Sequence, residues 1–299
     1  MNPKISLVML LALFLSGPRL FADTGYESEF KHWEQLAESG DPTAQYRLAN
    51  FYEHGWGVPA DEKAAATWYL RAASQGHRDA QFNLGIMYMD GRGVIQDAKA
   101  ASVWFRKAAE AGEERAQCNL GTLYEQGLGV AQDNREALKW FLASARQGDS
   151  MAQYNLGVKY MSGMGVPRDI GEARRWLELS AEQGYAAAQY KLGWLYSNGQ
   201  DLNQDLNKAA SWFRLAAKQG EPLAIYALGI MAANGQGVPQ DSVAALAFFT
   251  VSATLGNDLA IEARNQLEAA MTPDAILRGQ ELAKRWKPEK KMPLDQQLP

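Results

Sequence analysis

The side chains best suited to metal, acid–base or nucleophilic chemistry are few in this sequence and do not gather. The histidines His32, His54 and His77 come without HExxH spacing or paired cysteines, so they do not predict a metal site. Ser28 and Lys31 match a serine–x–x–lysine pattern, but the further motifs of an acylating serine enzyme do not follow. We therefore predict no catalytic, metal-binding or cofactor-binding residue, and no enzyme.

The remaining reactive groups have structural explanations. Glu113 and Glu114 are adjacent, so on a helix they point apart, and acids at a helix start favour the helix dipole. Cys118 is the only cysteine, which excludes an internal disulfide, and we expect it to pack as a small hydrophobe. The Gly-x-Gly turns lack the third glycine and the preceding strand of a dinucleotide site.

Composition limits the class of protein. The chain has 299 residues, of which 47% are hydrophobic, enough for one large domain or an array of small units. Its formal charge of −4 supplies no basic face that could release counterions from phosphates. The sequence therefore predicts no nucleic-acid partner.

The N-terminus has the pattern of a secretory signal peptide, residues 1–22. Lys4 precedes an apolar run from Ile5 to Leu15, and a small residue, Ala22, marks the expected cleavage point. An uncleaved anchor is the alternative, because Leu20 is a poor residue three positions before that point. No later segment could cross a bilayer, so we predict a periplasmic or secreted protein without stable membrane insertion after cleavage.

A 36-residue repeat occupies residues 41–256 in six copies. In the copies, alanine, leucine and tyrosine recur four residues apart, as at Ala152, Leu156 and Tyr160, and only the last copy has alanine, Ala232, in place of the tyrosine. Side chains at i, i+4 and i+8 share one face of a helix, so these columns predict a first helix with a buried stripe.

The second half of each copy predicts a turn and another helix. Gly163 and its equivalents end the first helix, and Asp169 and its equivalents should accept the free amide hydrogens of the second. A tryptophan such as Trp176 recurs in that helix, where we expect it to pack in the core against small alanines; a ligand cage is the alternative. Asp201 replaces the second turn glycine of the fifth copy, which makes that turn unusual.

The ends of the array resemble caps. Residues 23–40 should form an N-terminal capping helix, and residues 257–286 should form two C-terminal capping helices, the last starting at Thr272 and Pro273. Residues 287–299 are rich in Lys, Pro and Gln and are predicted to be disordered.

The repeat string, as in Ala152-Gln153-Tyr154-Asn155-Leu156-Gly157 with the later Gly, Asp, Ala and Trp columns, resembles the Sel-1-like repeat (SLR) family, which is related to tetratricopeptide repeats. The resemblance implies an all-α, right-handed superhelical solenoid that serves as an adaptor or scaffold, often in the bacterial envelope, in signalling or in host contact. Some cysteine-rich members were proposed to act on β-lactams, but this chain lacks their cysteine pairs.

One position before the leucine column carries the candidate binding residues. It lies about 100° from the buried stripe, so its side chains should avoid the core. Asparagine both donates and accepts, and a row of asparagines on a concave wall could grip an extended peptide, with the flanking basic residues favouring a carboxylate-bearing ligand. The row consists of Arg47, Asn83, Asn119, Asn155 and Lys191.

Two alternatives stay open at this stage. The asparagines could instead be a family signature that bonds to the backbone of a neighbouring repeat. The leading hypothesis for function is binding of a protein or peptide segment on the concave face, and its rivals are a hydrolase acting on cell-wall or β-lactam substrates and a passive structural element of the envelope.

Overall fold

The computed structural model describes residues 24–199 and 203–286, and these residues form fifteen α-helices and no strand. The predicted signal peptide, the predicted disordered tail and Asp201 lie outside the described residues. The helices are α1 Thr24–Glu38, α2 Pro42–His54, α3 Glu62–Ser74, α4 Arg78–Asp90, α5 Ala98–Glu110, α6 Glu114–Gln126, α7 Asn134–Arg146, α8 Ser150–Ser162, α9 Ile170–Glu182, α10 Ala186–Asn198, α11 Leu206–Lys218, α12 Pro222–Asn234, α13 Ser242–Thr254, α14 Asp258–Glu268 and α15 Pro273–Arg285.

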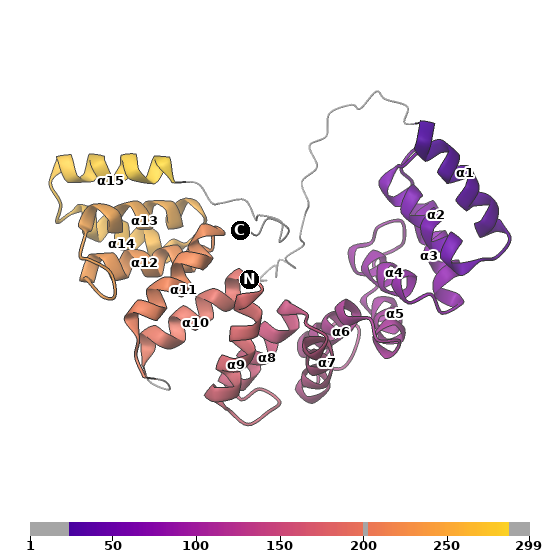
Figure 1. Ribbon diagram of the computed structural model, residues 1–299, viewed down its shortest axis with the longest axis horizontal. Coiled ribbons are helices and arrows are strands. Elements are labelled where there is room, and N and C mark those ends of the chain that lie inside the picture. The colour runs from indigo at the N-terminus through magenta and orange to yellow at the C-terminus, as the bar shows by residue number, and fades with distance from the viewer. Residues whose placement is uncertain (1–23, 200–202, 287–299) are drawn as a thin grey trace, which may run out of the picture.

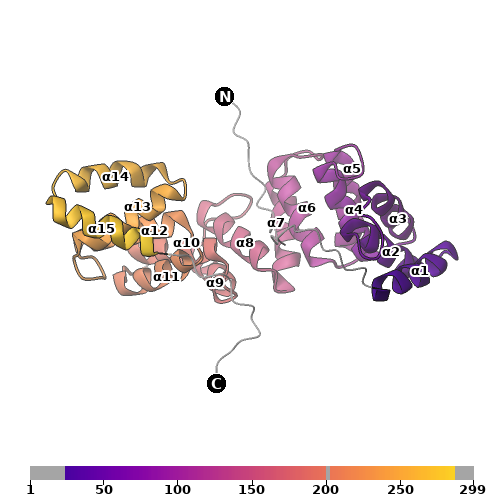
Figure 2. The same ribbon diagram turned by 90° about the horizontal axis from the view of Figure 1, so that it is seen from above.

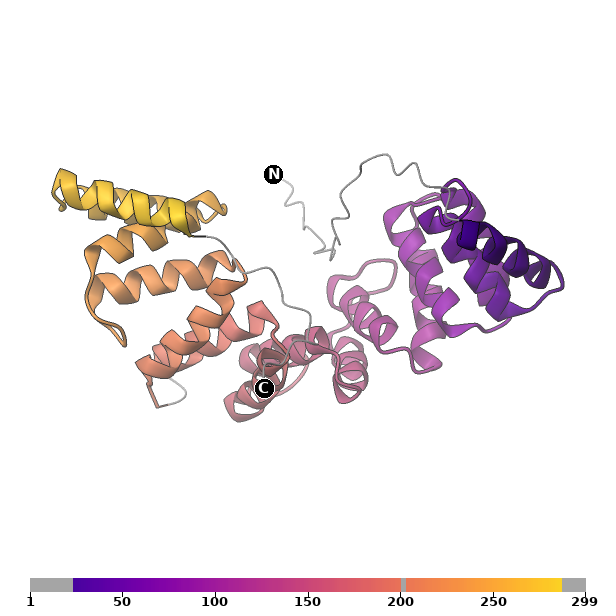
Figure 3. The ribbon, with the colours of Figure 1, turned by 45° about the horizontal axis from the view of Figure 1, so that its top comes forward.

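The helices form a curved array of two-helix units. The even-numbered helices from α2 to α12 are the first helices of the six units, and the helix after each is the second. In Figure 1 the array is a crescent with α1 and α15 at its tips, and α4, α6 and α8 lie nearer the hollow side than α5, α7 and α9. Figure 2 and Figure 3 show that successive units also rotate. The predicted all-α superhelical solenoid is confirmed.

The predicted helix ends are also observed. The first helices end at glycines with positive φ, such as Gly163 with φ 74°. The second helices begin after aspartates, such as Asp133, whose carboxylate accepts from the amides of Arg135 and Glu136. Each turn is therefore specified by residues that lie within it.

The second turn glycine does more than shape the turn. A Cβ built on Gly93 would lie 2.0 Å from the carbonyl oxygen of Glu62, which belongs to the preceding unit. Gly129 approaches Ala98 in the same way. These glycines let the backbone of one turn touch the start of the second helix before it, so they set how closely units stack.

In each unit, one side chain of the second helix inserts beside the first helix as a central knob. We expected the tryptophan to be this knob, but the knob is the residue that follows the tryptophan position. Phe141 is fully buried, whereas its neighbour Trp140 keeps 9% of its surface exposed. The hole is a glycine of the first helix, since a Cβ on Gly121 would lie 2.8 Å from the Phe141 ring. The six knobs are Tyr69, Phe105, Phe141, Leu177, Phe213 and Phe249.

The tryptophans pack around this centre. In the repeated tryptophan column, Trp140 and Trp176 are buried, and Trp68, Trp104 and Trp212 are partly buried against the core. A cation of the chain lies over several of the rings: Arg71 is 4.3 Å from the centroid of Trp68, and Lys107 is 4.2 Å from that of Trp104. These rings therefore contribute to packing and do not form an open ligand cage.

A ladder of glutamines links the two helices of a unit and joins one unit to the next. Gln45 donates to the carbonyl oxygen of Ala37 at 3.2 Å, and Gln75 donates to the side-chain oxygen of Gln45 at 2.8 Å. The same side-chain pair recurs in three more units, at Gln147 and Gln117, Gln183 and Gln153, and Gln219 and Gln189.

The second unit breaks this ladder. Gln81 still donates to the Ala73 carbonyl at 3.1 Å, but Ala111 stands where the other units carry the donor glutamine. The buried Oε1 of Gln81 is consequently without a hydrogen-bond partner. The sixth unit avoids the problem because both positions are apolar, with Ile225 and Leu255.

The array ends by a change of packing. The face of α14 carries Arg264 at the leucine-column position, so the apolar stripe stops there. Helix α15 packs on α13, and Gly279 permits the approach because its Cβ would lie 2.8 Å from Leu246. Within residues 24–199 and 203–286, none of the helices combines the length and apolar character needed to cross a membrane.

We predict that Ala111→Gln stabilises the protein by about 1 kcal/mol, because it supplies a donor to a buried acceptor that now has none. Denaturant unfolding should show a higher midpoint with an unchanged slope. The gain should vanish in a Gln81→Leu background, and a gain of equal size there would contradict the mechanism.

We predict that Gly93→Ala destabilises the protein by at least about 2 kcal/mol more than Gly112→Ala. Both glycines have positive φ, so both variants suffer backbone strain, but a Cβ on Gly112 meets nothing within 4 Å. Thermal unfolding of the two variants measures the difference in stability. If both variants lost the same stability, the clash of the new Cβ with Glu62 would be relieved by local movement without an energetic cost.

Candidate functional site

The five candidate residues lie at equivalent positions of successive first helices, from α2 to α10. Arg47 is exposed, and the other four are half-buried. The prediction that this position avoids the core is therefore confirmed. We call the surface formed by these side chains and their neighbours on the same side of the first helices the inner face.

Within residues 24–199 and 203–286, the asparagines of the row make no hydrogen bond to backbone. Asn83 interacts with the hydroxyl of Tyr69, a residue of the preceding unit. Within the described residues, the side chains of Asn119 and Asn155 make no hydrogen bond. Lys191 makes no ion pair there, and its Nζ lies 5.9 Å from the centroid of the Tyr190 ring. The row therefore presents unused donors and acceptors.

The inner face of the first two units is a polar network. The Tyr69 hydroxyl hydrogen-bonds to Asn50 at 2.7 Å and to Glu53 at 2.6 Å, and Arg92 donates to Glu53 at 2.8 Å. Burial, followed by the charge of Glu53, raises the pKa of Tyr69 well above its ordinary value. Burial also raises the pKa of Asp90, which lies 3.6 Å from Arg92. Tyr69, Asn50, Glu53 and Arg92 are thus linked by hydrogen bonds, whereas the buried Asp90 Oδ2 and Arg92 Nε have no hydrogen-bond partner within the described residues.

Sequence analysis missed a buried ion pair between the third and fourth units. The side chain of Lys159 is 1% exposed, and its Nζ lies 2.8 Å from Glu125 and 3.3 Å from Asn134. The signal was available in the repeat, because the equivalent positions of the other units carry large apolar residues: Phe51, Met87, Leu123, Leu195 and Met231.

The inner face of the last three units carries little charge. Helices α8, α10 and α12 contain two charged residues among them, the buried Lys159 and the half-buried Lys191. Trp194 on α10 is 40% exposed. The number of charged side chains on the inner face therefore falls along the array.

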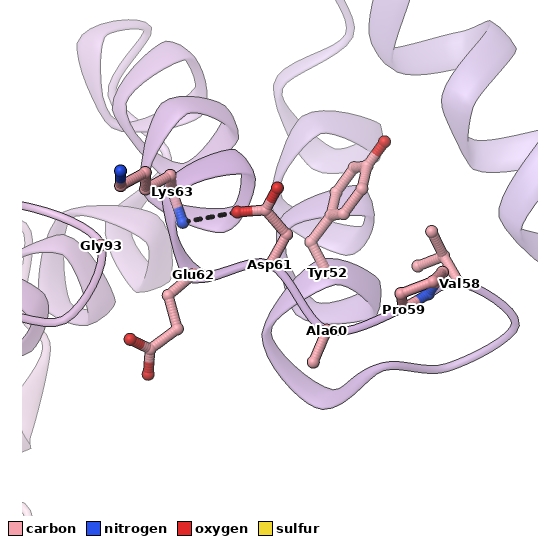
Figure 4. A pocket seen from close by; sticks show the side chains of 8 residues that line it. All are labelled: Tyr52, Val58, Pro59, Ala60, Asp61, Glu62, Lys63 and Gly93. Carbon is pink, nitrogen blue, oxygen red and sulfur yellow. Dashed lines mark hydrogen bonds between the residues drawn. The ribbon is translucent and has the colours of Figure 1, made fainter.

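A pocket of about 600 Å³ lies away from the inner face, at the first turn, beside Gly93 of the next unit. Figure 4 shows Asp61 and Lys63 on its wall, where the amide of Lys63 donates to the Asp61 carboxylate at 2.9 Å. That carboxylate is the N-cap of α3 and also accepts from Ala64. The pocket is thus lined by the turn between α2 and α3, and the same kind of turn joins the two helices of the other units.

The remaining reactive groups have structural roles. His77 caps α4 by accepting from Ala80 at 3.3 Å, and Glu113 caps α6 in the same way at 2.6 Å. Cys118 is buried, and burial raises the pKa of its thiol. In residues 24–199 and 203–286, no three His, Cys, Asp or Glu side chains gather as metal ligands.

Comparison with known proteins identifies the repeat. Six consecutive segments, residues 42–77, 78–113, 114–149, 150–185, 186–221 and 222–257, match the Sel1 repeat. The chain belongs to the Sel1 repeat family. Sel1 repeat proteins generally act in protein–protein interaction. No curated protein matches the chain.

Two solved Sel1 repeat structures are similar. One is c5321, a protective antigen of uropathogenic Escherichia coli strains with an SLR fold, at 36% identity and a TM-score of 0.77 over 85% of this chain and 55% of that one. The chain thus spans about half the length of that antigen. The other is a Sel1 repeat protein from Oxalobacter formigenes, at 31% identity and a TM-score of 0.70 over 77% of this chain and 92% of that one.

We predict opposite results for the two partners of the buried ion pair in this Sel1 repeat protein. Glu125→Ala should destabilise it by about 3 kcal/mol, because it leaves the Lys159 charge buried and unpaired, whereas Lys159→Met should be neutral or stabilising by about 1–4 kcal/mol. Denaturant unfolding measures both. If Lys159→Met lost as much stability as Glu125→Ala, the pair would be a net source of stability.

Proposed function

We propose that this Sel1 repeat protein is an exported scaffold of the bacterial envelope that binds an extended segment of another protein on its inner face. The main observation in support of this proposal is the row of polar side chains, in which Asn119 and Asn155 have no hydrogen-bond partner within the described residues. Asparagines in such a row can pair with the backbone of an extended peptide without reading its sequence.

Two further observations support the proposal. The pattern of residues 1–22 favours export to the periplasm or the medium. The similar protein c5321 is a protective antigen, which is consistent with a protein that meets the outside of the cell. The reactive groups named above serve as caps or core, so a binding role accounts for the inner face better than catalysis does.

The test is a variant with Asn83, Asn119 and Asn155 all replaced by alanine. A photo-crosslinking residue at Arg47 should capture one partner from living cells with the wild-type chain and not with the triple variant, since the variant lacks the donors and acceptors that hold the peptide. Mass spectrometry of the crosslinked band measures the loss.

Thermal unfolding is the control. The triple variant should unfold within a few degrees of the wild type, because the three side chains lie outside the core. Capture that survives in the variant would disprove the role of the row, and an equal loss of capture and stability would assign the asparagines to structure. Sustained turnover of nitrocefin or release of muropeptides by the purified protein would favour an enzyme instead.

A further inference from the structure

The six units provide an internal comparison, because a residue needed for packing should recur in every unit. The fifth first helix departs from the other units at two positions, Tyr185 and Trp194. Tyr185 is the N-cap residue directly before α10, and Trp194 lies on α10 together with Lys191, so the three residues gather at one helix.

Trp194 departs in size and exposure. The other units carry Asn50, Ile86, Thr122, Val158 and Ile230 at this position. Trp194 is 40% exposed, whereas all five equivalents are half-buried. Val158 and Ile230, on the neighbouring first helices α8 and α12, extend this apolar row on either side. A large exposed aromatic within an apolar row is typical of a binding hot spot.

Tyr185 departs by giving up a stabilising bond. The residue before each of the other five first helices caps its helix with a side-chain hydrogen bond, at Asp41, His77, Glu113, Asp149 and Glu221. Tyr185 makes no such bond before α10. Its ring instead lies 5.3 Å from that of Tyr154, with both side chains half-buried. The helix therefore lacks the side-chain cap of the others, whereas the aromatic pair has a counterpart in the stacked rings of Tyr46 and His77, whose centroids lie 4.5 Å apart.

Lys191 supplies the charge. It is three residues before Trp194, so the two side chains are neighbours on one face of α10. No acidic side chain pairs with Lys191 in the part of the chain that the structure describes, and the neighbouring helices α8 and α12 add no exposed charge to this face. The charge of Glu221, which precedes α12, acts on Tyr190 beside Lys191, but the Glu221 and Lys191 side chains form no ion pair within the described residues. Lys191 next to the exposed Trp194 is complementary to an apolar ligand that carries one negative charge.

We propose that the fifth unit selects the partner segment, by holding an apolar side chain on Trp194 and an adjacent Asp or Glu side chain on Lys191. This inference rests on the proposed binding of an extended segment by the inner face, and it names the chemistry of that segment. In this proposal the asparagine row hydrogen-bonds to the backbone of the partner segment, and α10 contacts its side chains.

The test begins with a random dodecapeptide library displayed on phage and selected against the wild-type protein. The enriched peptides should share an apolar residue next to an acidic one. The best peptide is then synthesised with an acetylated N-terminus and an amidated C-terminus, so that its only carboxylates are side chains, and its Kd is measured by fluorescence anisotropy.

Three variants define the site. Trp194→Ala should weaken binding at least tenfold. Lys191→Glu should weaken it to a similar degree, and a peptide with Lys in place of its acidic residue should bind Lys191→Glu better than it binds the wild type. Leu215→Ala is the matched control, because Leu215 is 44% exposed on α11 of the same unit, and it should bind as the wild type does. Thermal unfolding of each variant verifies the fold.

The outcomes separate this inference from the proposed function. Peptides that depend on Asn83, Asn119 and Asn155 but bind Trp194→Ala and Lys191→Glu normally would overturn the inference and leave the proposed function intact. Binding that is insensitive to both sets of residues, or no enrichment at all, would count against both. Binding that requires a free C-terminal carboxylate would overturn the assignment of Lys191 to an acidic side chain.

Discussion

The fit of one buried ring into the space beside one glycine organises this solenoid. Phe141 can reach the first helix of its unit only because Gly121 has no side chain, and the same pairing recurs in most units. The ring also belongs to a core cluster with Leu156 and Trp176 of the next unit, so its burial depends on the stacking of units. The second turn glycine makes that stacking close, because it lets backbone meet backbone between units.

This constraint divides the surface into two kinds of position. Positions that face the knob or the turn hold a similar residue type in most units, since a change at any of them disturbs two units. Positions on the inner face are free of that requirement, and there the units diverge. Asn50 and Glu53 near one end of the array and the exposed Trp194 nearer the other lie on first helices, so the array presents different side-chain chemistry along its length.

Departures from the repeat within the core differ from those on the inner face, because a core residue must be accommodated by its packing neighbours. Lys159 and Ala111 both break a structural pattern, and the structure shows what each requires. The lysine is buried with Glu125 as its partner, whereas the alanine leaves the Gln81 oxygen without one. Because the other units show the usual residue type at each of these positions, the six units serve as internal controls for both departures.

The sequence alone determined the repeat, the helix ends and the helical face that avoids the core. These features depend on residues within about four positions of one another: a glycine such as Gly163 ends its own helix, and an aspartate such as Asp133 caps its own. The same local spacing placed Asn119 and its row on the inner face.

The tertiary structure decided which of two adjacent aromatics is the knob, because Trp140 and Phe141 differ by only one step around the helix. It also decided the partners of Lys159, Gln81 and Gly93, and the packing of α15 on α13. These contacts join residues of different helices or of successive units, and they depend on the small rotation between units, which no spacing within one repeat encodes.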